Sequence, residues 1–181
     1  MLSLLILIIL CWQFYIGYSR GIILQSFYFL GSIVALFIAK AHYQTLAQKI
    51  TLWLPYSNPA EDAKLSFFKS VSIFDLSEVY YAGAAFVMIF IAVYCLVRLI
   101  GILVHFAPVD YFDAYYYKII SGLLAVIVAV FVFSMVGTVL ATIPFPILQS
   151  HLASSHLMVF LINHLPIFSH LWQTLWVDAV L

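Results

Sequence analysis

Residues Ile119 to Ile143 read IISGLLAVIVAVFVFSMVGTVLATI, an uncharged run of 25 residues between Lys118 and Pro144. At 1.5 Å per residue, a helix of about 20 residues crosses the roughly 30 Å hydrocarbon core of a bilayer. Hydrocarbon offers no water to backbone N–H and C=O groups, so a crossing segment must satisfy them internally, as a helix does. This stretch therefore predicts a transmembrane helix.

Three further runs of the same kind precede it. They cover residues 2–18, 22–39 and 79–97, and none contains a charged side chain. They are too long and too continuously apolar for the strands of a membrane barrel, which would alternate apolar and polar residues. The sequence therefore predicts an all-α membrane protein, built as a bundle of four transmembrane helices.

The four spans together make up a transmembrane domain over residues 1–146. The long polar stretch at 40–78 is expected to be a loop, although its first part, Ala41 to Leu52, can continue the second helix. Residues 147–181 have no apolar run long enough for a fifth span, and Trp172 and Trp176 lie one turn apart. Tryptophan favours the headgroup level of a membrane, so we expect an interfacial helical tail at the C-terminus.

The composition agrees with a membrane setting. Of 181 residues, 66% are apolar and 8% charged, against about 45–50% and about 25% in soluble domains. The formal net charge is zero, which gives no basis for a nucleic-acid partner. The first apolar run has no preceding Lys or Arg and no small-residue cleavage site after it, so we expect a retained helix. The two cysteines, Cys11 and Cys95, lie in apolar runs and predict no disulfide framework.

The chain contains none of the motifs that usually indicate catalysis. It has no phosphate-binding glycine loop, no H-E-x-x-H and no G-x-S-x-G. The tail carries four histidines, but no two are spaced four apart as metal ligands on one helix face would be. We therefore expect no enzymatic activity, no cofactor and no metal, and the histidines are interpreted as interfacial. The tail histidines are His151, His156, His164 and His170.

Arg20 is the candidate functional side chain. It lies between Gly17 and Gly21, in a tight hairpin that joins the first two spans at a membrane surface. A guanidinium there can bind a lipid phosphate or a partner protein, and Asp110 and Asp113 are possible partners on the same side. An anchor in a tight turn is the simpler interpretation, and both remain open.

Arg98 is interpreted as an interfacial anchor, because the uncharged run 79–97 before it is long enough to reach the far membrane surface. Small residues form a separate signal. Gly31, Ala35 and Ala39 recur at a spacing of four in the second span. Such a face lets helix backbones approach closely, so these residues predict helix packing, either within the chain or in a homo-oligomer.

Gly17-Tyr18-Ser19-Arg20-Gly21 resembles the G-x-x-R-G hallmark of the colicin V production protein family (CvpA). Other stretches that are similar to that family extend over essentially the whole chain. They include Leu24-Gln25-Ser26, Ala41-His42-Tyr43, Leu52-Trp53-Leu54-Pro55-Tyr56 and Pro144-Phe145-Pro146. The chain departs from the pattern before the fourth span, where only Gly122 remains of a Gly-x-x-x-Gly run.

The resemblance implies a multi-pass protein of the bacterial cytoplasmic (inner) membrane without catalytic activity. It implies an accessory role in production or secretion of the toxin colicin V and in envelope maintenance. The expected partners are membrane lipids and a further membrane protein or a second copy of the chain. The alternative is an oligomeric small-solute transporter or channel subunit, which would need a pore lined by polar side chains from several copies.

Overall fold

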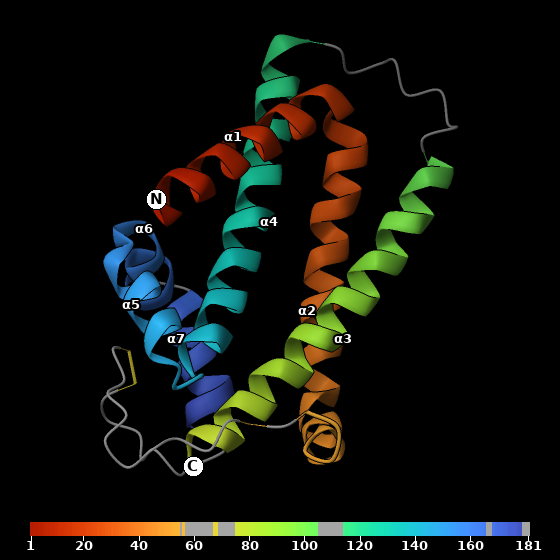
Figure 1. Cartoon of the computed structure of the whole chain (residues 1–181). Coiled ribbons are helices and arrows are strands. Elements are labelled where there is room, and N and C mark those ends of the chain that lie inside the picture. The colour runs from red at the N-terminus through yellow and green to blue at the C-terminus, as the bar shows by residue number, and fades with distance from the viewer. Residues whose placement is uncertain (55, 57–66, 69–74, 105–113, 166–167, 179–181) are drawn as a thin grey trace.

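The predicted four-span bundle is confirmed. The computed structural model describes residues 1–54, 56, 67–68, 75–104, 114–165 and 168–178, and these form helices without any strand. Four of the helices are long and apolar enough to cross a membrane. They are α1 (Leu2–Arg20), α2 (Ile22–Ile50), α3 (Leu76–Val104) and α4 (Tyr115–Ala141). Figure 1 shows α3 running obliquely across α2 and α1 slanting across the upper part of α4.

The helices extend further than the apolar runs that predicted them. The helix α2 has 29 residues and ends at Ile50, so the first part of the stretch 40–78 continues the second helix, as the sequence allowed for Ala41 to Leu52. At the other end of that segment, α3 already begins at Leu76. The predicted spans stopped at the first charged side chain. A helix can nevertheless continue into the headgroup layer, where water solvates groups such as Lys40 and Lys49.

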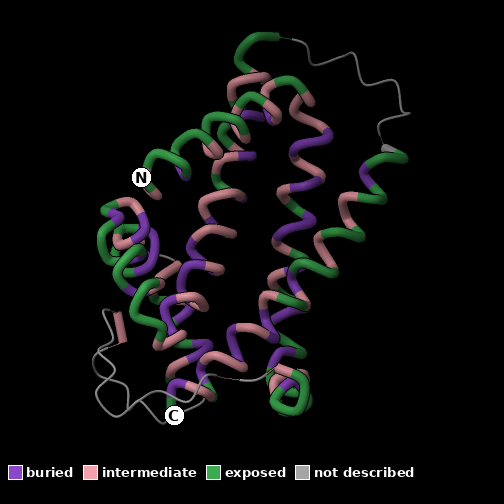
Figure 2. Tube along the Cα trace, viewed as in Figure 1, coloured by how far each residue is buried: buried purple, intermediate pink, exposed green. Residues whose placement is uncertain are grey.

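The outer surface of the bundle is apolar, as lipid contact requires. On α1 the side chains of Leu4, Ile8 and Trp12 are 65%, 56% and 61% exposed. Figure 2 shows exposed residues along much of α1 and on α3. A soluble protein rarely leaves so large a continuous apolar surface in contact with water. Between lipid-exposed helices the hydrophobic effect contributes little, so close packing and hydrogen bonds must hold the bundle together.

Small residues provide that close packing between α2 and α3, which lie along each other for much of their length. Gly31 is buried, and a Cβ added there would collide with the side chain of Val97. Ala35 and Ala39 have no exposed surface. Gly31, Ala35 and Ala39 therefore lie within the chain's own helix packing.

A second close approach joins α1 to α4. A Cβ at Gly17 would lie 2.5 Å from Ala125 Cβ and 2.8 Å from the backbone oxygen of Ser121. One helix turn away, Gly122 lies against the ring of Phe14, with 2.6 Å between a Cβ there and Cε2 of the ring. The single remaining glycine of the family's glycine run thus still allows the two helices to meet.

The chain reverses direction between α1 and α2 at a single residue. Gly21 has φ 84° and ψ 161°, a combination that is essentially restricted to glycine. It is the one residue with positive φ in the described part of the chain, as the predicted glycine hairpin requires. The hydroxyl of Ser121 donates to the carbonyl oxygens of both Gly17 and Gly21 and so ties this turn to α4.

After α4 the chain folds back on the bundle as short helices, which lie beside the lower part of α4 in Figure 1. Pro146 is at the first position of α5, where its missing N–H is not needed. Gln149 donates from Nε2 to the carbonyl oxygens of Ala141 and Ile143, at 2.9 Å each, and satisfies the end of α4. These elements are α5 (Pro146–Ser154), α6 (His156–Val159), η2 (Phe160–His164), α7 (Phe168–Trp172) and η3 (Gln173–Val177).

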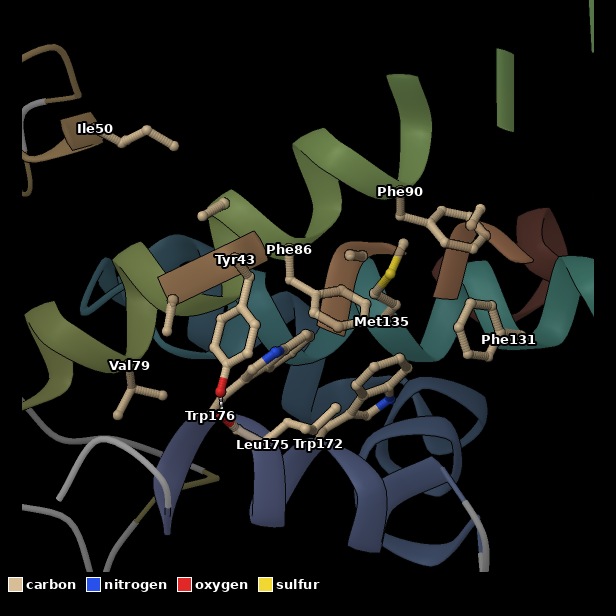
Figure 3. Close-up of a cluster of buried hydrophobic side chains, with 14 residues drawn as sticks. Tyr43, Ile50, Val79, Phe86, Phe90, Phe131, Met135, Trp172, Leu175 and Trp176 are labelled. Atoms are coloured by element: carbon tan, nitrogen blue, oxygen red, sulfur yellow. Dashed lines mark hydrogen bonds between the residues drawn. The ribbon is translucent and has the colours of Figure 1, made fainter. Parts of the chain in front are cut away.

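The two tail tryptophans do not face the headgroups as their spacing suggested. Trp172 and Trp176 are each 1% exposed, and their rings stack with centroids 4.7 Å apart. Both rings contact Phe86 of α3, as Figure 3 shows. The hydroxyl of Tyr43 on α2 donates to the carbonyl oxygen of Leu175 at 2.7 Å. The tail thus contributes two large aromatic side chains to the main core, because large rings gain more contact there than at a surface.

Candidate functional site

Two arginines from different helices lie against one tyrosine ring. The guanidinium carbon of Arg20 is 5.3 Å from the ring centroid of Tyr28, and that of Arg98 is 4.9 Å from the same centroid. The two guanidinium carbons can therefore be separated by no more than the sum of these distances. Arg98 also lies 5.9 Å from the ring of Tyr94. We call these four residues the arginine–tyrosine cluster.

Three helices position the cluster. Arg20 is in the last turn of α1, and the reversal at Gly21 places the start of α2, with Tyr28, beside it. Helix α3 supplies Tyr94 and Arg98, which are four residues apart and so share one helix face. None of the three helices alone would bring two cations together, so the cluster is a product of the bundle.

The ring of Tyr28 is itself held in place by a glycine on α3. Tyr28 is only 6% exposed. A Cβ added at Gly101 would lie 2.7 Å from Cζ of this ring and 2.5 Å from its hydroxyl oxygen. The absence of a side chain at Gly101 therefore creates the space that the ring occupies.

The position of Arg98 differs from that of an anchor at a helix end. Helix α3 continues beyond it as far as Val104, about 9 Å further at 1.5 Å per residue. Arg98 is partly buried and directed at Tyr28 of the neighbouring helix. The sequence allowed for a snorkelling side chain, whereas the structure shows one that contacts protein.

The forces within the cluster nearly balance. A cation over an aromatic face gains about 0.5–1 kcal/mol when exposed and about 2 kcal/mol when desolvated. Two unit charges about 10 Å apart repel by roughly 1–2 kcal/mol at an effective dielectric constant of about 20. The attraction to the ring and the repulsion between the arginines are thus of the same order. An anion that pairs with both guanidiniums would change this balance decisively.

A groove of about 270 Å³ adjoins the cluster. All four long helices line it: Arg20 and Arg98 contribute charge, while Phe90, Val132 and Phe133 are among its apolar residues. Gln25 also lines the groove, is 2% exposed, and has a buried Oε1 without a hydrogen-bond partner. The site therefore combines two cations, an unsatisfied amide oxygen and an apolar wall.

The predicted site residues have different positions in this structure. Arg20 belongs to the cluster and Gly21 forms the turn beside it. Gly17 is buried against α4, so the interpretation of Gly17 as a contact for lipid or a partner is corrected to one of helix packing. Asp110 and Asp113, considered as partners of Arg20, lie outside the described residues.

No group of three His, Cys, Asp or Glu side chains that could hold a metal ion occurs among the described residues. Both cysteines are exposed and unpaired with each other. The chemistry that the arginine–tyrosine cluster offers is positive charge and N–H donors, which suits the binding of an acidic group.

The fold and site define a class: a helical membrane protein with four candidate spans and a cationic cluster beside an apolar groove. Residues 2–166 match the family described as "Colicin V production protein", and the chain belongs to this family. It is also 32% identical over 180 residues to the "Uncharacterized transmembrane protein YshB" of Bacillus subtilis (strain 168), and the match covers 97% of each chain. No solved structure matches the chain.

Sequence reasoning identified Arg20 but not the residues that surround it. Gln25 stood out only as part of the family-like stretch Leu24-Gln25-Ser26, and Tyr28 carried no signal of its own within an apolar helix. On α3, Tyr94, Arg98 and Gly101 follow one another at spacings of four and three, and this shared helix face could have been noticed. That the face meets Arg20 depends on the packing of α2 against α3.

Proposed function

We propose that this chain is a non-enzymatic accessory protein of the bacterial cytoplasmic membrane. It supports production or secretion of colicin V-type toxins and maintenance of the envelope, as its family suggests. It acts by binding an acidic group at the arginine–tyrosine cluster, from a membrane lipid or from a partner membrane protein.

The observation that carries this proposal is the convergence of Arg20 and Arg98 on Tyr28, at distances of 5.3 and 4.9 Å. Guanidinium groups bind phosphates and carboxylates through paired N–H donors. Two of them at one location, partly buried beside a groove, provide more binding energy than a single exposed anchor. Such a cluster holds a ligand without making or breaking a bond in it.

Complementation of a deletion strain tests the proposal. Wild-type protein, Arg20→Ala, Arg98→Ala and Lys49→Ala are expressed in cells that lack the native chain. Lys49 is an exposed cation at the far end of α2, so Lys49→Ala is the matched loss of one charge. Toxin export and envelope integrity are measured, together with the amount of each variant in the membrane fraction.

We expect Lys49→Ala to complement fully and both arginine variants to fail while they accumulate normally. Full complementation by Arg20→Ala and Arg98→Ala contradicts the proposal. So does solute flux through proteoliposomes that contain only this chain, because flux indicates the transporter or channel class instead.

A further inference from the structure

We propose that the groove between the four long helices binds one anionic phospholipid. Its phosphate pairs with Arg20 and Arg98, a hydroxyl of its headgroup donates to Oε1 of Gln25, and the upper part of one acyl chain lies against Phe90 and Phe133. This inference rests on the proposed function and names the ligand of the same site.

Among the described residues, no carboxylate lies near the arginine pair; Asp110 and Asp113 lie outside them. The described carboxylates are those of Asp75, Glu78 and Asp178, and they lie near the opposite end of the molecule. Asp75 immediately precedes α3, whose start lies near the C-terminus at the bottom of Figure 1. From Glu78 to Arg98 the helix rises by roughly 30 Å at 1.5 Å per residue. These carboxylates therefore cannot neutralise the arginine pair.

The groove has a charged part and an apolar part, which suit the headgroup and the acyl chain of a lipid. Its charged part is formed by Arg20 on α1 and Arg98 on α3, and its apolar part includes Phe90, Val132 and Phe133. The volume of about 270 Å³ is slightly below the roughly 300–1,000 Å³ of drug-sized sites. It fits a phosphate and the first methylenes of a chain, with the rest of the lipid in the bilayer.

Gln25 adds a second, independent indication of a ligand. Its side chain is 2% exposed, and its Oε1 is buried without a hydrogen-bond partner. A buried acceptor left unpaired is unfavourable, so native structures nearly always satisfy it with protein, water or a ligand. An amide oxygen accepts a hydrogen bond and cannot bind a phosphate oxygen directly. A headgroup with a free hydroxyl, such as that of phosphatidylglycerol, supplies both the anion for the arginines and the donor for Gln25.

Native mass spectrometry of the full chain, delipidated in detergent, tests the inference. Phosphatidylglycerol, phosphatidylethanolamine and phosphatidic acid are added back separately, and the bound lipids are counted. Inorganic phosphate and glycerol phosphate serve as competitors without an acyl chain. The proteins are wild type, Arg20→Gln, Arg98→Gln, Arg98→Lys, Gln25→Leu and the control Lys49→Gln.

We expect wild type and Lys49→Gln to bind one phosphatidylglycerol in preference to phosphatidylethanolamine. Arg20→Gln and Arg98→Gln should each weaken this binding about tenfold or more, because each removes a charge-assisted hydrogen bond. Arg98→Lys keeps the charge and is expected to be intermediate, and it provides the test if Arg98→Gln does not fold. Gln25→Leu should reduce the preference for phosphatidylglycerol over phosphatidic acid.

The inference is overturned if wild type binds phosphatidylglycerol and phosphatidylethanolamine equally. It is also overturned if Arg20→Gln and Arg98→Gln bind phosphatidylglycerol as wild type does. Displacement of the lipid by inorganic phosphate or glycerol phosphate at equal concentration shows a site for a soluble phosphate and overturns it too. In a further outcome, the arginine variants bind lipid as wild type does but no longer co-purify with an acidic membrane protein. That result shows a protein ligand at the cluster and also overturns the inference. If the arginine variants lose the lipid yet complement the deletion, the proposed function fails and the lipid site remains.

Discussion

The ring of Tyr28 occupies the space that a Cβ at Gly101 would need. The added atom would lie 2.7 Å from Cζ of the ring, closer than two carbons can approach without rearrangement. Because Arg20 and Arg98 both lie against this ring, the missing side chain at position 101 determines where the two cations meet.

We therefore expect Gly101→Ala to displace Tyr28 and to disturb the arginine pair. The free energy of unfolding should fall by about 1–3 kcal/mol, as for other overpacked sites, and the variant should behave like Arg98→Gln in lipid retention. Thermal unfolding in detergent and the lipid count measure the two effects. Ile102→Ala, at a side chain that is 55% exposed on the same helix, is the matched control and should change neither.

Gly17 sets the approach of α1 to α4. Gly17→Ala should destabilise the bundle by about 1–3 kcal/mol, since its Cβ would lie 2.5 Å from Ala125 Cβ. Adding Ala125→Gly in the same chain should recover part of the loss but not all, because the backbone oxygen of Ser121 remains 2.8 Å from the new atom. The unfolding midpoints of the two single variants and the double variant measure this coupling. Additive effects would contradict the contact.

The hydroxyl of Ser134 connects the tail to α4. It donates to the carbonyl oxygen of Leu161 at 2.8 Å and accepts from Trp172 Nε1 at 3.0 Å. Ser134→Ala leaves both groups unpaired in a buried place, which should lower stability by about 1–3 kcal/mol. Unfolding followed by tryptophan fluorescence measures the change. Ser150→Ala, which removes an exposed local hydrogen bond on α5, should unfold like wild type; equal losses in both variants would refute the role of Ser134.

Tyr56 gives the protein a pH dependence in the alkaline range. Burial, with the nearby Tyr80 and Tyr81 as smaller causes, raises the pKa of Tyr56 from 10.0 to about 12. Its neutral hydroxyl donates to the carbonyl oxygen of Thr142 at 2.9 Å. The pKa of Tyr56 is higher in the folded than in the unfolded state. The contribution of its neutral hydroxyl to the free energy of unfolding is therefore complete below pH 10 and is lost as the pH rises towards 12.

Unfolding midpoints of wild type and Tyr56→Phe should therefore differ most below pH 10 and converge towards pH 12. The difference between the two proteins isolates Tyr56 from the other tyrosines. A difference that stays constant over this range would show that Tyr56 titrates no differently in the folded and unfolded states.

The four spans could be predicted because each of them is a local property. An uncharged run such as 119–143 must be helical in hydrocarbon whatever surrounds it, and the structure has α4 there. The ends of the helices were less predictable. Residues 40–50 are charged and polar enough for a loop, yet they remain helical, because a helix does not have to end where it leaves the hydrocarbon.

The candidate site was predicted only in part. Arg20 and Gly21 could be identified from the glycine hairpin, since a turn of one residue between two helices needs glycine. Gly17 was grouped with them because it belongs to the G-x-x-R-G motif, but its position on α1 directs it at α4. The tail tryptophans were assigned to the membrane surface from their chemistry, and the structure buries them beside Phe86.

The sequence by itself determined that the chain crosses a bilayer as helices, because the mismatch between apolar side chains and water is set by composition along each segment. Only the tertiary structure decided that Arg20 and Arg98, far apart in the chain, share the ring of Tyr28. The physical reason is that helix packing depends on which small residues meet across an interface. Gly31 beneath Val97 and Gly101 beneath Tyr28 fix how α2 lies on α3, and no single helix contains that information.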